Sequence, residues 1–151
     1  MTKSEKMVAL TQAVRSVFNR LKAMGDGLHG DLQVTTAMRA VMETLSASGA
    51  MTVPQIAKNK GVTRQHIQLL ADALCEQGLA IMKENPAHRR SSLIALTEKG
   101  QRTFAKMQAR EVPVIEALAE DFSVQDLERA TLVLNRIAAH LDARLNGEGG
   151  E

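Results

Sequence analysis

Thr52-Val53-Pro54-Gln55 opens the stretch that decides the fold of this 151-residue chain. A threonine followed three residues later by glutamine is typical of a capping box, and Pro54 falls in the first turn, where a helix does not use the backbone N–H. The pattern therefore predicts a helix from Val53 to about Lys60.

A second helix is predicted directly after a tight turn. Gly61 supplies the left-handed residue that commonly ends a helix, and Thr63 offers a new N-cap. Apolar residues then recur at the spacing of a buried helical stripe until Gly78, namely Ile67, Leu70, Ala71 and Leu74. Two short helices joined by a turn of about three residues form a helix-turn-helix.

The outer face of this second helix is polar and graded in charge. Arg64, Gln65 and Gln68 come first, and the acidic residues Asp72 and Glu76 follow one and two turns later. A helix N-terminus favours phosphate, and a recognition helix reads the major groove with its N-terminal residues. Arg64 can pair with guanine and Gln65 with adenine, each through two hydrogen bonds. The alternative for these side chains is a solvated helix face.

Thr63 and His66, at the start of the same helix, each have an alternative role. Thr63 is a helix cap first, and any phosphate contact is secondary to that role. His66 either faces DNA or covers the start of the helix. Both are kept with Arg64, Gln65 and Gln68 as candidate DNA-binding residues.

Two strand-like runs follow Gly78. They are LAIMK at 79–83 and SLIAL at 92–96, joined by ENPAHRRS at 84–91. This pattern predicts a β-hairpin whose loop ends in Arg89 and Arg90. A basic hairpin beside a duplex would contact phosphates or a narrow minor groove, whereas the alternative is a solvated loop. A hairpin after a helix-turn-helix is a wing, so the segment is predicted to be a winged helix.

The same residues resemble the MarR family of bacterial transcription regulators. The resemblance rests on an ordered set of fragments over about half the chain: Gly49–Thr52, Ile56-Ala57, Gly61–Thr63, Gly78-Leu79, Asn85–Arg90 and Leu96–Gly100. It implies a helical homodimer with two winged helices that usually represses promoters, often until a small ligand or oxidation releases it. It also makes Arg90 the usual wing-tip arginine. The chain departs from the family where many members carry an acidic residue before the wing arginines, because it has Ala87 and His88 there.

Charge is distributed unevenly along the chain although the net charge is only +2. Residues 52–110 carry ten Lys and Arg against four Asp and Glu, a net of +6, whereas residues 111–151 carry three against nine, a net of −6. The positive block coincides with the predicted winged helix, as expected of a surface that binds phosphates. The acidic block is expected to face away from DNA.

Long helices are predicted on both sides of the winged helix. Apolar residues from Met7 to Leu28 alternate spacings of three and four, a narrow seam that suits a helix packed against another long helix. Another helix, between this long helix and the helix-turn-helix, is predicted from Thr35 or Thr36 to about Ala47. Glycines 25, 27 and 30 are expected to fray the end of the first helix.

The C-terminal part is predicted to hold two more helices. Thr97 caps one that runs past Pro113, where a missing backbone N–H favours a kink. Ser123 caps the last, whose stripe ends at Leu145.

These patterns predict a mainly α fold with a small β-wing, in four parts. Residues 1–34 are an N-terminal dimerisation helix, 35–100 the winged helix-turn-helix, 101–146 the connecting and C-terminal dimerisation helices, and 147–151 a disordered tail. A helix-turn-helix gains specificity as a two-fold homodimer, because recognition helices about 34 Å apart read successive major-groove faces of a palindrome. The alternative is a winged helix that binds protein or RNA without reading DNA sequence.

Several other functions are excluded or disfavoured. No nucleophile and base, phosphate-cradling loop or metal cluster occurs at a recognisable spacing, so an enzyme, a cofactor and a metal are not expected. The lone Cys75 is interpreted as a buried thiol and not a redox sensor, and it fits a reducing, cytoplasmic location. No apolar run is long enough for a membrane span. Met38 and Met42 either line a pocket for a small effector or pack in the core.

Overall fold

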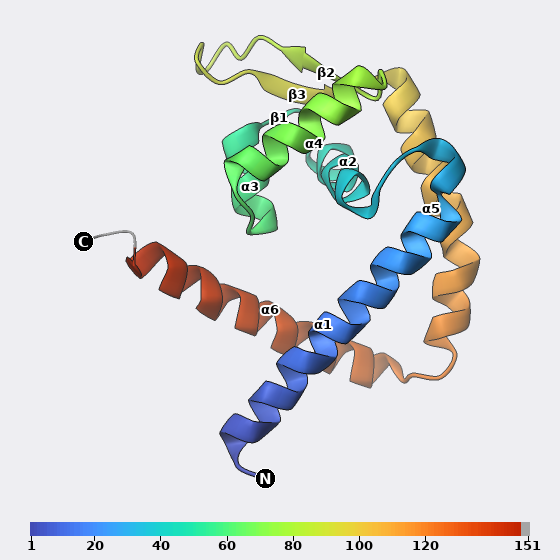
Figure 1. Cartoon of the computed structure of the whole chain (residues 1–151), viewed down its shortest axis with the longest axis vertical. Coiled ribbons are helices and arrows are strands. Elements are labelled where there is room, and N and C mark those ends of the chain that lie inside the picture. The colour runs from blue at the N-terminus through green and yellow to red at the C-terminus, as the bar shows by residue number, and fades with distance from the viewer. Residues whose placement is uncertain (149–151) are drawn as a thin grey trace. The chain divides into compact units, whose positions relative to one another are not determined.

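The computed structural model describes residues 1–148 and confirms a mainly helical fold with a small sheet (Figure 1). The elements are α1 (Lys3–Leu28), a 3-10 helix (Gly30–Leu32), α2 (Thr36–Ser48), β1 (Met51–Thr52), α3 (Val53–Lys60), α4 (Arg64–Glu76), β2 (Ala80–Lys83), β3 (Leu93–Leu96), α5 (Glu98–Ala119) and α6 (Val124–Glu148). The chain divides into two compact units, Met1–Gln108 and a second that begins at Ala109. No helix in the described residues is long and apolar enough to cross a membrane.

The helix-turn-helix forms as its caps predict. The Thr52 hydroxyl accepts from the Gln55 backbone N–H at 3.3 Å, and the Gln55 side chain accepts from the Thr52 N–H at 2.9 Å, which completes the capping box of α3. Gly61 ends α3 with a φ of 67°, in the left-handed region that favours glycine. The Thr63 hydroxyl then accepts from the His66 N–H at 3.1 Å and starts α4.

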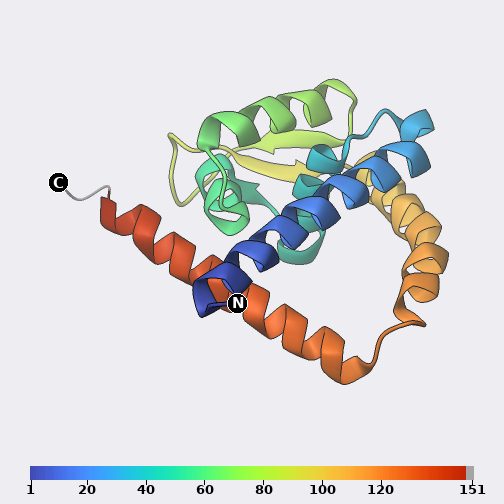
Figure 2. The ribbon, with the colours of Figure 1, turned by 60° about the horizontal axis from the view of Figure 1, so that its bottom comes forward.

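The wing strands β2 and β3 belong to a three-stranded antiparallel sheet in the order β1-β3-β2, with β3 in the middle. Ala80 pairs with Leu96 and Lys83 with Leu93, so the hairpin loop begins after Lys83. β1 adds a strand that the sequence did not predict, with Met51 opposite Ile94. A two-residue strand is too short to show the alternation by which strands are recognised. Figure 2 shows the sheet lying beside α3 and α4.

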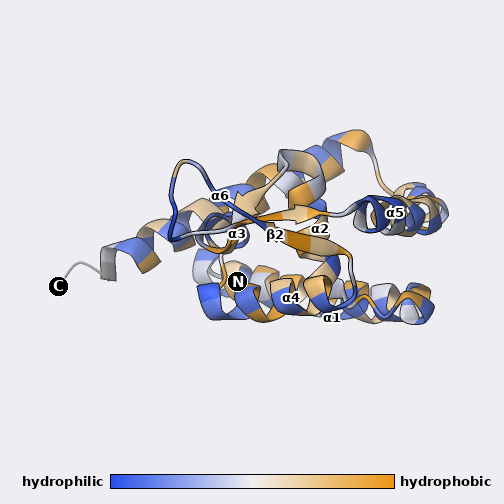
Figure 3. Ribbon diagram, turned by 90° about the horizontal axis from the view of Figure 1, so that it is seen from above, coloured by the Kyte–Doolittle hydropathy of each residue, from blue (hydrophilic) through white to orange (hydrophobic). Residues whose placement is uncertain are grey.

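The core of the first unit is aliphatic and lies among α2, α3, α4, the sheet and the start of α5. Its most deeply buried side chains are Met42, Ile56, Ile67, Leu74, Leu79, Ile94 and Met107. Burial of each large aliphatic side chain contributes about 1.5–3 kcal/mol, so these contacts fix the position of α4 against the sheet. Figure 3 shows the contrast between the apolar strands and the hydrophilic loop of the wing.

The start of α5 is fixed to the turn that follows α4. The Thr97 hydroxyl accepts from the Gly100 N–H at 3.0 Å, which confirms the predicted cap, and donates to the Gly78 carbonyl at 2.6 Å. A Cβ at position 100 would lie 2.0 Å from the Leu79 carbonyl oxygen. Only glycine therefore allows α5 to approach this turn.

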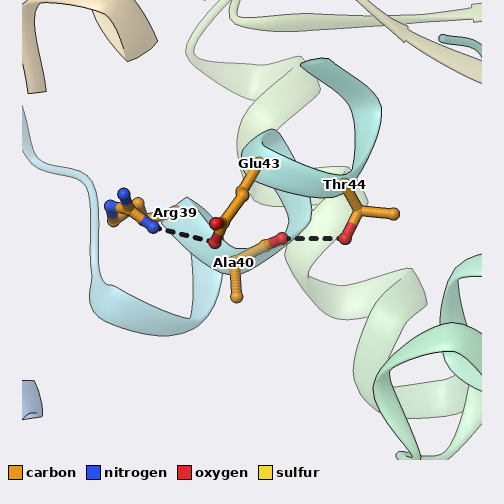
Figure 4. A network of polar contacts seen from close by, with 4 residues as sticks. All are labelled: Arg39, Ala40, Glu43 and Thr44. Carbon is orange, nitrogen blue, oxygen red and sulfur yellow. Dashed lines mark hydrogen bonds and ion pairs between the residues drawn. The ribbon is translucent and has the colours of Figure 1, made fainter. Parts of the chain in front are cut away.

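A small network of polar contacts lies on α2, and Figure 4 shows its members Arg39, Ala40, Glu43 and Thr44. Arg39 Nη1 lies 2.9 Å from Glu43 Oε2, one turn along the same helix, and the guanidinium lies 5.4 Å from the centre of the Phe104 ring. The buried Thr44 hydroxyl donates to the Ala40 carbonyl at 3.2 Å. The cation–π contact places the charge of Arg39 over an aromatic face at the edge of the core.

The end of α1 differs from the prediction. Gly25 and Gly27 lie within the helix, which ends at Leu28, so the expected fraying at these two residues was wrong. The reason is tertiary: a Cβ at Gly25 would lie 2.9 Å from Thr36 Oγ1, and that hydroxyl and the Thr36 N–H both donate to Asp26 Oδ1. α1 thus supplies a second cap for α2.

The second unit contains the end of α5 and all of α6. α5 continues through Pro113, and the boundary between the units falls at residues 108 and 109, in the turn whose backbone bond the proline removes. Ser123 Oγ accepts from the Asp126 N–H at 3.1 Å, the predicted cap of α6. Gly147 and Glu148, expected in a disordered tail, continue α6. The rest of that predicted tail, residues 149–151, lies outside the described residues.

Candidate nucleic-acid interface

The N-terminal half of α4 presents the predicted residues to solvent. Arg64, Gln65, His66 and Gln68 are all exposed, while Ile67 between them is buried in the core. The Thr63 hydroxyl is engaged by the His66 backbone, so its capping role accounts for it. Gln68 Nε2 donates to Asp72 Oδ1 at 2.8 Å, which holds the amide along the helix. The opposite face of α4 is thus packed in the core, and this packing positions the exposed polar face.

Four of the predicted residues line one hollow between α4 and the wing. Arg64, Gln65 and Gln68 contribute from the helix and Arg90 from the hairpin loop, and the hollow has a volume of about 420 Å³. The rest of its lining is Val53, Pro54, Met82, Ser91 and Ser92. Arg90 comes 22 or more positions after the three α4 residues in the sequence. The fold therefore brings the two segments to one concave surface that carries two arginines and two amides.

Arg89 lies in a different place from its neighbour. It lines a separate hollow of the wing with Glu84, Asn85, Pro86 and Ser92. The two arginines are adjacent in sequence, yet of the two only Arg90 lines the hollow beside the N-terminal end of α4. Sequence spacing could not separate them.

Asn85 braces the tip of the wing. Its side-chain oxygen accepts from the Ala87 N–H at 3.1 Å, and its carbonyl accepts from the His88 N–H at 3.2 Å. A further turn joins the Ser91 N–H to the His88 carbonyl at 3.2 Å. These bonds form an Asx turn followed by main-chain turns, so the loop has an ordered path although Ala87 and His88 stand where many MarR members carry an acidic residue.

The candidate arginines of α4 and the wing have no carboxylate partner in the described part of the chain. Within residues 1–148, no ion pair involves Arg64, Arg89 or Arg90. An exposed guanidinium without a protein partner can bind phosphate or a base edge without first breaking an internal bond.

Some lining residues were missed by the sequence interpretation. Met82 was assigned only to a strand, but its side chain is 42% exposed and lines the hollow with Arg90. Ser91 and Ser92 follow the arginines and add two hydroxyl groups to the same surface. The position of Ser91 and Ser92 beside Arg90 was a signal that could have found them.

Met38 and Met42 lie in the core of the first unit. Their side chains are 4% and 0% exposed. A hollow of about 540 Å³ near the end of α2 is lined by other residues, among them Leu45, Lys83 and Phe104. Core packing accounts for both methionines, and a role in ligand binding stays a prediction.

Cys75 is half-buried at the edge of the core. Burial, and to a lesser degree the Asp72 carboxylate, raises the pKa of its thiol above the ordinary value. A raised pKa lowers the fraction of reactive thiolate at neutral pH, as expected of an inert thiol. The described residues include no group of His, Cys, Asp and Glu side chains that could hold a metal ion.

Comparison with solved structures shows which proteins share this fold. No protein-family profile matches the chain. The MarR family transcription regulator SP03579 has 26% sequence identity, covers 93% of this chain and 95% of its own, and superposes with a TM-score of 0.78. The chain therefore has the fold of MarR family transcription regulators. Its structural neighbours are transcription regulators and not enzymes.

Other similar structures differ in what they contain. The transcriptional repressor CouR, bound to a 23-mer DNA duplex, has 24% identity, a TM-score of 0.77 and covers 91% of this chain and 98% of its own. BpsR of Bordetella bronchiseptica, whose DNA binding is regulated by 6-hydroxynicotinic acid, has 18% identity, a TM-score of 0.74 and covers 85% and 91%. In sequence, uncharacterized proteins of Mycobacterium tuberculosis and Mycobacterium bovis are 32% identical over 140 residues, which is 93% of this chain and 97% of theirs.

Proposed function

We propose that this protein is a member of the MarR family and a cytoplasmic, sequence-specific DNA-binding repressor that acts as a homodimer on a palindromic operator. The observation that carries the proposal is the shared surface of Arg64, Gln65, Gln68 and Arg90. On this surface the start of α4 enters the major groove. Arg64 pairs with a guanine and Gln65 with an adenine, while Arg90 contacts the adjacent backbone.

Apolar stripes on the long helices support the homodimer. On α1, Met7, Val14, Val17 and Leu21 are 40–55% exposed, and on α6 Leu127, Leu134, Leu141 and Leu145 are 40–66% exposed. Contiguous exposed apolar stripes of this kind are typical of protein interfaces. A second copy of the chain is the proposed occupant, because two recognition helices are needed to read a palindrome.

Release by a small ligand is the regulatory part of the proposal. Met38 and Met42 are the proposed apolar walls, and their burial means that a ligand must open the packing of α2 to reach them. The Met42→Ala substitution, which leaves a cavity there, should change the ligand concentration that releases operator DNA. A change confined to the protein's stability, with the same release curve, would remove Met42 from the site.

A salt titration separates this function from the alternative of a protein-binding or RNA-binding winged helix. Binding to duplex DNA through about six phosphates should weaken steeply with salt, with a slope of log K against log salt of roughly −5. A hydrophobic protein interface should respond little. The titration is done with a selected operator and with random duplex DNA, and a steep slope with no difference in affinity between the two would reject sequence-specific binding. A parallel titration with RNA should give weaker binding than the operator.

A further inference from the structure

Few large apolar side chains of the winged helix are exposed. Across residues 35–108, all of which are described, only Val62, Leu69, Ile81 and Met82 are large apolar side chains with more than 40% exposure. They lie on the turn before α4, on α4 itself, and on β2. Met82 lines the hollow that holds Arg64 and Arg90. Met82 thus belongs to the candidate interface, and Leu69 lies on the same helix as the candidate residues Arg64, Gln65 and Gln68.

Leu69 is the most exposed of these side chains, at 65%. Gln65, Leu69, Asp72 and Glu76 follow one another at spacings of four, three and four, so they share one face of α4. The buried Ile67, Ala71 and Leu74 occupy the opposite face at the same spacings. Leu69 thus lies at the middle of the outer face, one turn after Gln65 and among polar residues.

The major groove offers this side chain one kind of apolar partner. Base edges there present hydrogen-bond donors and acceptors, and the only apolar group among them is the 5-methyl of thymine. A leucine facing a polar edge would leave the donors and acceptors of that edge unpaired, whereas a methyl group lets both surfaces lose water. The distance between Gln65 and Leu69 along the helix axis is about 6 Å, close to two base-pair steps.

We infer that Leu69 reads the 5-methyl group of a thymine in the major groove, within about two base pairs of the base that Gln65 reads. The inference rests on the proposed function and adds to it a base preference that involves no hydrogen bond. Each half-site is then read by an amide on one base pair and by an apolar contact on a neighbouring pair.

Replacing thymine with uracil in the operator tests the inference, because uracil lacks only the methyl group. Each thymine of a selected operator is replaced in both half-sites, and affinity is measured for the wild-type protein and for Leu69→Ala. One position should weaken wild-type binding by about fourfold per half-site. The same replacement should leave Leu69→Ala unaffected, because the methyl group has already lost its partner.

Matched variants make the result specific. Leu69→Met keeps an apolar side chain of similar volume and should retain most of the sensitivity to the methyl group. This variant keeps the test decisive even if Leu69→Ala fails to fold. Ile81→Ala removes another exposed apolar side chain and should keep the full sensitivity. Gln65→Ala should relax a different position, within two base pairs of the methyl-sensitive one.

The outcomes separate the inference from the function on which it rests. Operator binding that responds to no uracil replacement, or that responds equally in wild type and Leu69→Ala, would overturn the role of Leu69 and leave the DNA-binding function intact. If selection yields no consensus sequence at all, the proposed function fails and the inference fails with it.

Discussion

The winged helix differs from the long helices α1 and α6 in how far its apolar side chains are exposed to solvent. In the winged helix, Ile56, Ala71, Leu74 and Ile94 are 0% exposed. In α1, by contrast, no residue is buried, and the side chain of Phe18 is 60% exposed. The winged helix completes a core within one chain, whereas the long helices carry apolar surface that a single chain leaves open to water. Folding of the winged helix and the proposed dimerisation would thus depend on different residues.

The largest expected effect comes from placing charge in the open seam of α1. Changing both Leu10 and Val14 to Asp should abolish the dimer and with it high-affinity operator binding, because a charge in a buried apolar seam loses its hydration. Sedimentation or light scattering measures the assembly, and circular dichroism should show an unchanged winged helix. Gln12→Asp places the same charge on another, exposed face of α1 and should leave the dimer intact. A double variant that stays dimeric would move the interface away from this helix.

Within the winged helix, Gly100→Ala should be among the most destabilising single substitutions. The added methyl group would lie 2.0 Å from the Leu79 carbonyl oxygen, which must shift together with the turn that fixes α5. The expected loss is about 3 kcal/mol in the free energy of unfolding, at the upper end of overpacking effects. Gly27→Ala is the control, because nothing lies within 4 Å of its added Cβ and it sits in a helix. That variant should gain about 0.5–1 kcal/mol. Equal denaturation midpoints for the two variants would contradict the close approach.

Arg64→Ala should reduce specific binding by about 1–3 kcal/mol and relax preference at one base position in each half-site. Its side chain is exposed and unpaired, so stability should change by less than about 0.5 kcal/mol. Binding curves with the operator and with random duplex DNA measure the effect. Equal weakening on both DNAs would mean that Arg64 contacts only the backbone.

The wing arginines should give smaller, sequence-independent losses. Arg90→Ala should lower affinity for all duplexes and reduce the salt slope by about one unit, since it removes one phosphate contact. Arg89→Ala is expected to act in the same way but more weakly, because Arg89 does not line the hollow beside α4 that Arg90 lines. Unchanged slopes in both variants would place the wing away from the duplex.

Local rules predicted much of this fold, and tertiary contacts account for what they missed. The caps at Thr52, Thr63 and Thr97 each depend on a residue three positions later, so the sequence was sufficient to find them. Gly25 was misread as a fraying signal because its reason is the approach of Thr36, eleven residues later.

The candidate site, too, was predicted in part by local rules and depends in part on tertiary contacts. The residues of α4 could be predicted from their order along one helix face. That Arg90 shares a surface with Arg64 while Arg89 does not depends on the path of the loop braced by Asn85, which no spacing rule encodes.

Selection of bound sequences from random duplex DNA tests the central claim most directly. The full-length dimer should enrich a palindromic consensus whose two half-sites lie about 10 base pairs apart, centre to centre, or a multiple of that spacing. The same selection with Arg64→Ala should lose information at one symmetric pair of positions and keep the rest. A selection that enriches no consensus, or one whose consensus is identical with Arg64→Ala, would contradict the account of α4 as the helix that reads DNA.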